Sequence, residues 1–568
     1  MFMGKKVLIV GGVAGGASAA ARVRRLDEFA EVIMFEKGPH VSFSNCCLPN
    51  HLSGMVENSD DLVLMSPEQF KNQYNIEARV NSEVLKVNRD SKTITIKNLE
   101  TGKEYEEGYH KLVLSPGANP IVPRIEGYNK NHVFTVRNVV DIDKLNRYVG
   151  NGKVKDIAVI GGGFIGVEVA ENLKLANKGF NVTLVEAADQ IMAPFDYDMV
   201  QILHKEMIDK GIDLIVGDGI SKIEDENIEL ASGKRLSAQV VVMAIGVRPE
   251  TTLAREAGLE IGETGAIKVD HNYQTNDKDI YAVGDAIEVY NKLTHRKTRL
   301  ALAGPAQRQA RAAADHMYGI PHRNTGVIGS SCIKIFDMNA ASTGLTEKAA
   351  KSAGIQYDFV YIIPGDIVGL MPGNSPFHLK LIYEIPSGKI LGAQAIGEGN
   401  ASKRIDVIAA IIMMGGTLED LKELELCYAP AFSTAKDPIN HASLVALNIL
   451  NGVFKQVPVY KVRELVESGA CIIDVREKDE YEAGHIINAI NIPLSEIRQR
   501  TSEIPKDVPV YLHCRSSQRS YNALVALQHI GYDNLYNISG SYLGISYHEY
   551  FNDKVTSREK ILTEYNFE

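Results

Sequence analysis

The stretch VSFSNCCLPNHLSG, residues 41–54, places two thiols side by side at Cys46 and Cys47. A cysteine attacks sulfur as a thiolate, so a reactive thiol needs surroundings that stabilise negative charge. We take Cys46 as the candidate nucleophile and expect a nearby helix dipole to lower its pKa. Cys47 has three interpretations: a bystander, a partner that resolves a mixed disulfide on Cys46, or the nucleophile itself.

A third candidate thiol is Cys514, which ends the apolar segment VPVYLH and begins the loop CRSSQR. A loop of this length before a helix directs backbone N–H groups at a thiolate or at the anionic sulfur of a persulfide. A phosphatase loop needs one more residue before its arginine, so the spacing favours sulfur over phosphate. The candidate sulfur-binding residues are Arg515, Ser516, Ser517, Gln518 and Arg519. We expect the remaining cysteines, Cys332, Cys427 and Cys471, to lie in the core.

Two glycine-rich turns must position whatever supplies electrons to these thiols. In KKVLIVGGVAGGASAAARVRRL (5–26) and in DIAVIGGGFIGVEVAENL (156–173), a strand leads through glycines into a helix. The first glycine and the acid that ends the next strand are 25 residues apart in both copies. Such a unit binds a pyrophosphate at the helix N-terminus and a ribose at the acid. The candidate cofactor-binding residues are Gly11, Gly12, Val13, Ala14, Gly15, Glu36 and Lys37 in the first copy, and Gly161, Gly163, Phe164, Ile165, Gly166 and Glu186 in the second.

The second acid indicates which nicotinamide cofactor is used. Glu186 would repel a ribose 2′-phosphate, and Ala187 and Ala188 follow it where a basic residue would favour the phosphate. The sequence therefore predicts NADH rather than NADPH.

A flavin is indicated by TNDKDIYAVGDAIEV (275–289), where a strand ends at Asp285, a carboxylate that could bind the ribityl chain of FAD. The segments 112–120 and 240–251 close the two nucleotide domains, the second through Gly246. A helix is expected within 300–317, with its N-terminus facing the flavin, and Ala303 is a further candidate cofactor-binding residue.

These ordered motifs resemble the two-dinucleotide-binding flavoprotein disulfide reductases over about residues 1–445. The resemblance implies an α/β chain with two Rossmann-like FAD/NAD(P)-binding domains and an α+β dimerisation domain that builds a homodimer. The implied boundaries are 1–118 and 250–325 for FAD, 119–249 for NADH and 326–445 for dimerisation.

Around the first thiols, SFSNCCLPN resembles the single-cysteine branch of that family, which comprises coenzyme A disulfide reductases, NADH peroxidases and NADH oxidases. The resemblance implies that Cys46 is catalytic, that Asn45 contacts the flavin and that Ser42 contacts substrate. Leu370 and Met371 stand where the reductases have two tyrosines, whereas Tyr428 matches a catalytic tyrosine of the dimer partner. Cys47 replaces a glycine and Asn50 a tyrosine.

The same resemblance implies that coenzyme A phosphates contact Arg22, with Lys71 as a second candidate. Arg24 and Arg25 on the same helix are equally well explained as a solvated face.

The C-terminal part, 461–568, follows an expected linker at 446–460 and resembles an α/β rhodanese domain. The match includes CIIDVREKDEYEAGHIINAINIPL (471–494) and the Cys514 loop. It implies that Cys514 carries sulfane sulfur as a persulfide.

Composition excludes some partners. The net charge of −10 argues against nucleic acid. The longest apolar stretch, 407–416, is about half of the ~20 residues of a membrane span, and no signal cleavage site follows the N-terminus. We therefore expect a cytoplasmic protein, and we assign no metal site.

Together the motifs predict an FAD-dependent, NADH-driven reductase of sulfur–sulfur bonds that acts through Cys46. Its substrates would be small thiol compounds: coenzyme A persulfide, polysulfide or coenzyme A disulfide, with coenzyme A also able to form a mixed disulfide. Cys514 would handle sulfane sulfur, and one chain would hold both thiols at a high effective concentration. Two alternatives remain: an NADH oxidase or peroxidase that uses a Cys46 sulfenic acid, and a sulfur-relay or redox-sensing binding protein.

Overall fold

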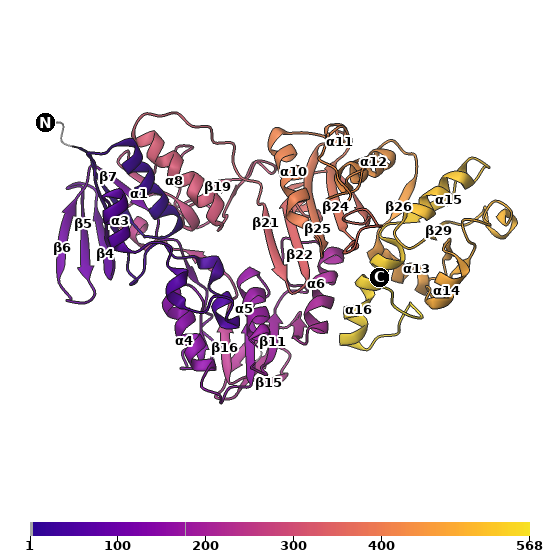
Figure 1. The fold of residues 1–568 in the computed structure, drawn as a ribbon, viewed down its shortest axis with the longest axis horizontal. Coiled ribbons are helices and arrows are strands. Elements are labelled where there is room, and N and C mark those ends of the chain that lie inside the picture. Colours follow the sequence, from indigo (N-terminus) through magenta and orange to yellow (C-terminus); the bar gives the residue numbers. More distant parts are fainter. Residues whose placement is uncertain (1–3, 177, 568) are drawn as a thin grey trace. The chain divides into compact units, whose positions relative to one another are not determined.

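The computed structural model describes residues 4–176 and 178–567, and the chain divides into two compact units. Unit 1 comprises the described residues up to Asp189 together with Ile215–Val327. Unit 2 comprises Gln190–Leu214 together with residues 328–567. Figure 1 follows the chain from the indigo start of unit 1 to the yellow end of unit 2.

The first sheet of unit 1 is parallel and buried on both faces. Its strands, in order, are β18 (Ile280–Ala282), β7 (Lys111–Leu114), β1 (Lys6–Val10), β2 (Glu31–Phe35) and β3 (Glu77–Arg79). Along β1, Val7 and Ile9 join the core formed with α1 (Ala14–Leu26) and α8 (Ala303–Met317). Leu8 and Val10 join the core on the other face. Burial on both faces explains why this strand is apolar throughout.

The second sheet of unit 1 repeats this plan. Its strands, in order, are β12 (Asp213–Val216), β11 (Asn181–Glu186), β10 (Asp156–Ile160), β16 (Val240–Met243) and β9 (Val133–Phe134). β10 runs parallel to both of its neighbours and leads into α5 (Phe164–Leu175). The prediction of two Rossmann-like domains is confirmed.

Smaller sheets complete unit 1. They are β4 (Ser82–Asn88), β5 (Thr93–Asn98) and β6 (Glu104–Gly108); β13 (Ile220–Ile223), β14 (Asn227–Leu230) and β15 (Arg235–Ser237); β8 (Ala118–Pro120) with β17 (Val247–Pro249); and β19 (Val289–Tyr290) with β20 (Lys297–Thr298). β8 and β17 pair antiparallel where the chain passes between the two nucleotide domains.

Unit 2 begins with an antiparallel sheet. Its strands, in order, are β21 (Ser331–Ile335), β22 (Met338–Gly344), β25 (Ile390–Gly397), β24 (His378–Glu384) and β23 (Tyr357–Ile362). The helix α10 (Ala401–Met414) packs against β22 and β25, and α12 (Pro438–Leu450) packs against β23 and β24. This is the expected α+β domain.

The second sheet of unit 2 is parallel. Its strands, in order, are β26 (Lys455–Val457), β30 (Leu535–Ile538), β29 (Val510–His513), β27 (Cys471–Asp474) and β28 (Ile490–Asn491). Its helices include α13 (Val462–Glu467), α14 (Lys478–Ala483), α15 (Gln518–Gln528) and α16 (Ser541–Thr556). The structure differs from the sequence prediction at 446–460: this segment holds the end of α12 and the edge strand β26, because β26 pairs with β30. It is therefore not a free linker.

Residues 190–214 also differ from the prediction, which assigned them to the NADH-binding domain. The helix α6 (Tyr197–Asp209) lies in this segment and packs against α16, so the segment belongs to unit 2. Its buried face includes Met199, Leu203 and Met207. No helix among the described residues is long and apolar enough to cross a membrane.

Candidate active sites

The first glycine turn brings its acid against the backbone of the turn. The Glu36 carboxylate accepts hydrogen bonds from the N–H groups of Gly12 and Gly38, each at 2.9 Å. Gly11 has φ +95°, and a Cβ on Gly16 would lie 1.8 Å from the carbonyl oxygen of Gly11. The helix α1 can therefore begin close behind the strand only with glycine at these positions.

The second turn has the same geometry. The Glu186 carboxylate accepts from Gly162 N at 2.6 Å and from Ala188 N at 2.8 Å. A Cβ on Gly166 would lie 1.8 Å from the carbonyl oxygen of Gly161, whereas a Cβ on Gly163 would meet nothing within 4 Å. Packing thus explains the glycine at 166, whereas no contact with another described part of the protein requires the glycine at 163.

The helix N-termini provide a test of whether dinucleotides fit. The helices α1, α5 and α8 have no side-chain cap, so their first N–H groups remain available to a ligand. By contrast, α3 (Pro67–Tyr74) is capped by Ser66 and α4 (Val139–Val149) by Asn138. The residues present therefore fit two bound dinucleotides.

The other predicted cofactor residues lie around these turns. Asp285 follows β18, and burial raises its pKa while Arg137 partly offsets the shift. Asn45 donates to the carbonyl of Arg137 at 3.4 Å. Lys37, a predicted cofactor-binding residue, forms an ion pair with Glu83, so its ammonium group is bound to a protein carboxylate. Val13, Ala14, Gly15, Phe164, Ile165, Gly246 and Ala303 lie in the turns or at the first residues of α1, α5 and α8.

Cys46 lies in a short 3₁₀ turn, Asn45–Cys47, directly after a segment bound to the first glycine turn. The N–H of Ser42 donates to the carbonyl of Gly12 at 2.8 Å. Cys46 is exposed and Cys47 is half-buried. The 3₁₀ turn is held by Cys47 N to Ser44 O and by Leu48 N to Asn45 O, both at 3.3 Å. A ring between adjacent cysteines would have to disturb this turn, which weakens that interpretation of Cys47.

The side chains around Cys46 act against the expected activation. Partial burial raises the pKa of Cys46, and the charges of Glu168, Cys47 and Asp285 raise it further. Glu168 on α5 is itself shifted, because burial and the nearby Glu171 raise its pKa to about 7. The prediction of a lowered pKa is wrong as far as the protein's own side chains are concerned.

The candidate coenzyme A contacts differ in how strongly other protein groups already bind them. The Arg22 Nε donates to Asp315 at 2.6 Å, so an incoming phosphate would compete with a carboxylate. Lys71 is exposed and, among the described residues, donates to the Asn75 side chain alone, at 2.9 Å. Arg24 is buried and donates to several backbone carbonyls, which makes it structural.

Tyr428 and the replaced tyrosine positions lie in exposed segments of the α+β domain. Tyr428 is 51% exposed and Leu370 is 93% exposed. The two segments are joined where Val368 N donates to Pro430 O at 3.3 Å. Cys427 and Cys332 are exposed as well, so the expectation of core thiols is wrong at these two positions. Cys471 is half-buried and packs against the hydrophobic core that includes Val510 and Leu512. β21 is an edge strand, and period-two burial turns Cys332 outward.

Cys514 is buried at the end of β29, with 1% of its surface exposed. Ser520 Oγ lies 3.6 Å from the sulfur. Ser517 adopts φ +76° just before α15 begins at Gln518, and α15 has no side-chain cap. Arg519 forms a two-fold ion pair with Glu480 (2.6 and 2.7 Å); this pair raises the pKa of Arg519, with a smaller contribution from Cys514. A helix N-terminus and a guanidinium thus border the thiol.

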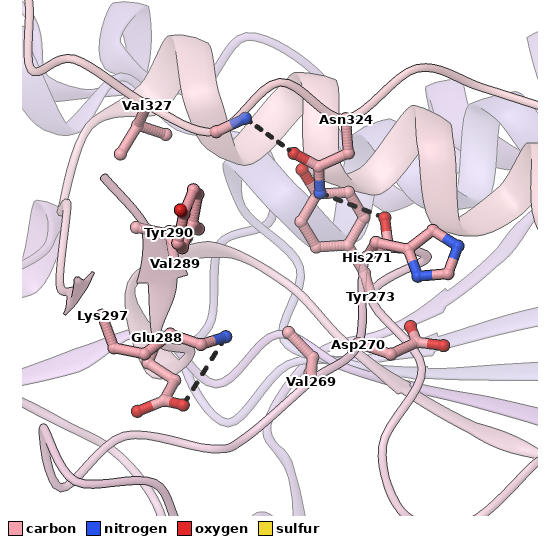
Figure 2. A pocket seen from close by; sticks show the side chains of 11 residues that line it. Val269, Asp270, His271, Tyr273, Glu288, Val289, Tyr290, Lys297, Asn324 and Val327 are labelled. Carbon is pink, nitrogen blue, oxygen red and sulfur yellow. Dashed lines mark hydrogen bonds and ion pairs between the residues drawn. The ribbon is translucent and has the colours of Figure 1, made fainter. Parts of the chain in front are cut away.

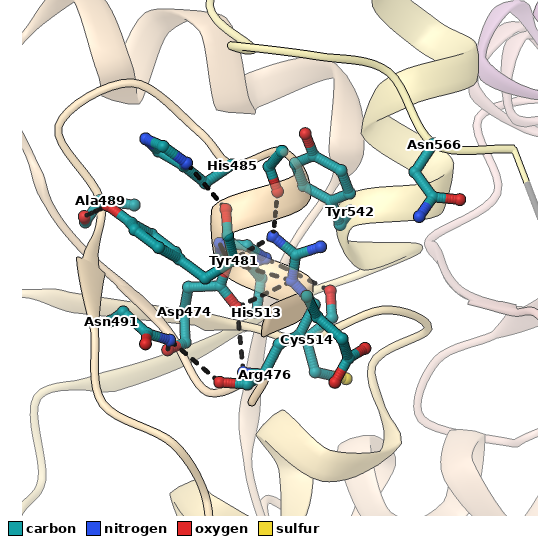
Figure 3. A network of polar contacts seen from close by, with 12 residues as sticks. Asp474, Arg476, Tyr481, His485, Ala489, Asn491, His513, Cys514, Tyr542 and Asn566 are labelled. Carbon is teal, nitrogen blue, oxygen red and sulfur yellow. Dashed lines mark hydrogen bonds and ion pairs between the residues drawn. The ribbon is translucent and has the colours of Figure 1, made fainter. Parts of the chain in front are cut away.

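A polar network behind Cys514 includes residues that the sequence analysis did not assign to the site (Figure 3). Arg476 donates to both oxygens of Asp474 and to the carbonyl of Gly484, and its guanidinium lies 4.0 Å from the ring centre of Tyr542. Another unassigned member is His513, whose Nε2 lies 3.6 Å from Asp474. Burial lowers the pKa of His513 despite that carboxylate. Its only sequence signal is its position before Cys514.

A cavity of about 270 Å³ beside β19 and β20 contains none of the predicted site residues (Figure 2). Its buried carboxylate, Glu288, lies 3.8 Å from Lys297 and accepts from Thr264 at 3.3 Å. The cysteines and glycine turns, rather than this cavity, define the candidate sites.

Comparisons with known proteins agree with this geometry. A family model for pyridine nucleotide-disulphide oxidoreductases matches residues 5–310, the dimerisation domain of that family matches 330–438, and a rhodanese-like domain matches 459–548. Coenzyme A disulfide reductases from Staphylococcus epidermidis and Staphylococcus aureus are 34% and 33% identical over 436 residues, 77% of this chain and 98% of theirs.

Solved structures extend the similarity to the C-terminal domain. Reduced Bacillus anthracis CoADR-RHD is 43% identical with a TM-score of 0.93, covering 96% of this chain and 98% of that one. A NAD-dependent persulfide reductase from A. fulgidus is 33% identical with a TM-score of 0.90, covering 95% and 99%. A water-forming NADH oxidase from Lactobacillus brevis is 27% identical with a TM-score of 0.75, covering 79% and 99%. The chain therefore belongs to the pyridine nucleotide-disulphide oxidoreductases, flavoproteins that use a nicotinamide cofactor, and it carries a rhodanese-like domain at its C-terminal end.

Proposed function

We propose that this enzyme uses NADH to reduce the sulfur–sulfur bond of a persulfide, a polysulfide or coenzyme A disulfide, with Cys46 as the reacting thiol and Cys514 as a carrier of sulfane sulfur. The observation that carries the proposal is the bond from Ser42 N to Gly12 O, which fixes the Cys46 segment to the first dinucleotide turn. Relatives named as coenzyme A disulfide reductases and as a persulfide reductase support the same chemistry.

The chain's own residues would hold FAD and NADH at the two glycine turns. FAD would be bound by the first turn, Glu36 and Asp285, and would transfer an electron pair from NADH to sulfur. The second turn would bind NADH, because the Glu186 carboxylate, fixed by Gly162 N and Ala188 N, can accept from ribose hydroxyls and would repel a 2′-phosphate.

At Cys46 the proposed reaction is thiolate attack on the carbon-bound sulfur of a persulfide R–S–S⁻. One proton is taken up, HS⁻ leaves, and the mixed disulfide Cys46–S–S–R forms. An electron pair that originates from NADH then restores the Cys46 thiolate and releases RS⁻. With coenzyme A as R, Lys71 is the freer phosphate contact, since Arg22 is bound to Asp315.

At Cys514 the proposed role is to accept or deliver the outer sulfur as Cys514–S–S⁻. The N-terminus of α15 and the guanidinium of Arg519 would stabilise that anion. Cys47 is proposed as a bystander that raises the pKa of its neighbour.

We further propose a homodimer. The matched dimerisation domain exposes Leu370 (93%), Phe432 (70%) and Tyr428 (51%), large apolar and aromatic groups typical of an interface. Tyr428 would then serve the partner's thiol site.

An NADH oxidase or peroxidase is the second candidate function. The exposed thiol of Cys46 and the apolar residues Leu370 and Met371 favour it, as does the similarity to a water-forming NADH oxidase. It predicts rapid NADH consumption with oxygen or peroxide alone, unaffected by Cys514→Ser.

The test is anaerobic NADH oxidation with coenzyme A persulfide, glutathione persulfide, polysulfide and coenzyme A disulfide. We expect Cys46→Ser to abolish turnover with all of them. We expect Cys514→Ser to lower turnover only with substrates whose sulfane sulfur passes through Cys514, and to leave the reduction of coenzyme A disulfide unchanged. The exposed thiol variant Cys332→Ser is the matched control. Full persulfide turnover by Cys46→Ser would overturn the assignment.

A further inference from the structure

The first turn of α16 is bonded directly to the Cys514 loop. Tyr542 N donates to the carbonyl of Cys514, and Leu543 N donates to the carbonyl of Arg515, both at 3.0 Å. Ser541 Oγ accepts from Cys514 N at 3.2 Å. Because two backbone bonds and one side-chain bond join these segments, a shift of this turn shifts the loop that contains the thiol.

One face of the same helix rests on the α+β domain. A Cβ on Gly540 would lie 2.7 Å from the ring of Tyr361, and a Cβ on Gly544 would lie 3.2 Å from it. The ring of Tyr547 lies 5.0 Å from the ring of His378. Positions 544 and 547 have the spacing of a single helix face, and Gly540 is the residue directly before the helix.

Glycine at 544 needs an explanation, since a mid-helix glycine costs about 1 kcal/mol relative to alanine. Gly540 has φ +74°, which by itself favours glycine, but Gly544 has no such backbone requirement. The close approach of the Tyr361 ring is the contact that an alanine at 544 would disturb.

Tyr361 on β23 and His378 on β24 form a buried pair, with Tyr361 Oη 2.6 Å from His378 Nδ1. Burial and the charge of Arg515 lower the pKa of His378 to about 3, so the imidazole is neutral. The charge of Arg515, the residue that follows Cys514, therefore acts on this pair. Ser539 Oγ also donates to the carbonyl of Tyr361 at 3.4 Å.

We infer that Tyr361 and His378 are positioning residues for sulfur transfer at Cys514. The ring of Tyr361 packs against Gly540 and Gly544, and the first turn of α16 is bonded to the Cys514 loop. The sheet of the α+β domain thereby sets the position of that loop. The inference rests on the proposed function in one respect only, that Cys514 carries sulfane sulfur.

The reaction to be measured is transfer from thiosulfate to cyanide. The Cys514 thiolate takes the outer sulfur of S₂O₃²⁻ to form Cys514–S–S⁻ and releases SO₃²⁻. Cyanide then removes that sulfur as SCN⁻ and restores the thiolate. Neither step needs NADH, so the assay isolates Cys514 in the full-length FAD-loaded enzyme.

The test variants are Tyr361→Phe, which keeps the ring and removes the bond to His378, and Gly544→Ala, which adds one methyl against the ring. The matched control is Tyr383→Phe in β24, because the Tyr383 hydroxyl is buried and has no hydrogen-bond partner among the described residues. Val555→Ala, on an exposed position of α16, controls for substitution in that helix.

We expect both test variants to lower kcat for transfer about five- to tenfold and to move the pH midpoint of Cys514 alkylation by iodoacetamide upward. The controls should stay within about twofold. Alanine favours the helix, so a loss in Gly544→Ala cannot come from a weaker helix. If both test variants match the controls in kcat and in the alkylation profile, the inference is overturned. A wild type that transfers no sulfur would instead refute the proposed role of Cys514, while the alkylation profiles would still decide the positioning.

Discussion

At the scale of single residues, Glu168 is the charged group that acts most strongly on Cys46. Its own pKa of about 7 means that it is mostly neutral below pH 7 and negative above it. Above pH 7 the Cys46 thiolate must therefore form beside a negative carboxylate, and the titrations of the two groups are coupled.

We expect Glu168→Gln to lower the pKa of Cys46, because a neutral amide does not repel the thiolate. The effect should be confined to pH above 7 and amount to about threefold faster alkylation at pH 8. Peptide-level mass spectrometry of Cys46 after iodoacetamide treatment of the FAD-loaded enzyme measures it.

Glu171→Gln is the matched comparison and should act in the opposite sense. Glu171 raises the pKa of Glu168, so its removal lets Glu168 ionise at lower pH and extends the repulsion downward. Shifts of Cys46 reactivity in the same direction for both variants would contradict this account.

At the scale of elements, the second strand–turn–helix unit contains glycines that we expect for two different reasons: space for a ligand at 163 and close packing at 166. We expect Gly163→Ala to raise KM for NADH about tenfold, or ~1.4 kcal/mol, without changing the unfolding temperature, because its Cβ meets no protein atom within 4 Å. Steady-state kinetics and calorimetry measure the two quantities.

Gly166→Ala is the counterpart, since its Cβ would lie 1.8 Å from the carbonyl oxygen of Gly161. Both the unfolding temperature and KM should change in this variant. Equal behaviour of the two variants would mean that the glycine at 163 does not reflect the approach of a ligand.

Elements formed by local spacing could be predicted from the sequence, and those formed by distant contacts could not. The glycine turns, the acids at 36 and 186 and the Cys514 loop each depend on residues within one strand–turn–helix unit. The grouping of α6 with unit 2 depends on α16, more than three hundred residues later. The raised pKa of Cys46 likewise depends on Glu168 and Asp285, which no pattern around 46 reveals.

At the scale of the molecule, unit 2 contains a buried charge cluster that joins segments far apart in sequence. Lys380 Nζ lies 2.8 Å from both oxygens of Asp198, 2.5 Å from Glu347 and 3.3 Å from Asp196. Burial alone would lower the pKa of Lys380, but the three carboxylates raise it above its usual range. The cluster ties the segment before and at the start of α6 to β24 and α9 (Glu347–Ala353).

We expect Lys380→Met, in the α+β domain, and Asp474→Asn, in the rhodanese-like domain, to lower the midpoint of the same unfolding transition. Each leaves buried charge without its partner, at a cost of about 3–5 kcal/mol, and the packing of α16 against α6 makes the domains unfold together. Scanning calorimetry measures the midpoint of this transition, and Cys514 alkylation is a second probe of unfolding. Glu503→Gln, at an exposed pair with Arg500, should leave the transition in place. Two separate transitions, each responding to one variant, would show that the domains are independent.

Four residues, 451–454, are all that separate α12 from β26. So short a connection does not act as a flexible tether, unlike the long arms that carry lipoyl or biotinyl groups. Cys514 therefore does not move freely over a long distance relative to α12. We propose that sulfur leaving Cys514 is carried by a diffusing small molecule. A scavenger of that carrier, added to the medium, should then lower the transfer of sulfur from Cys514 to Cys46 even though both thiols belong to one chain.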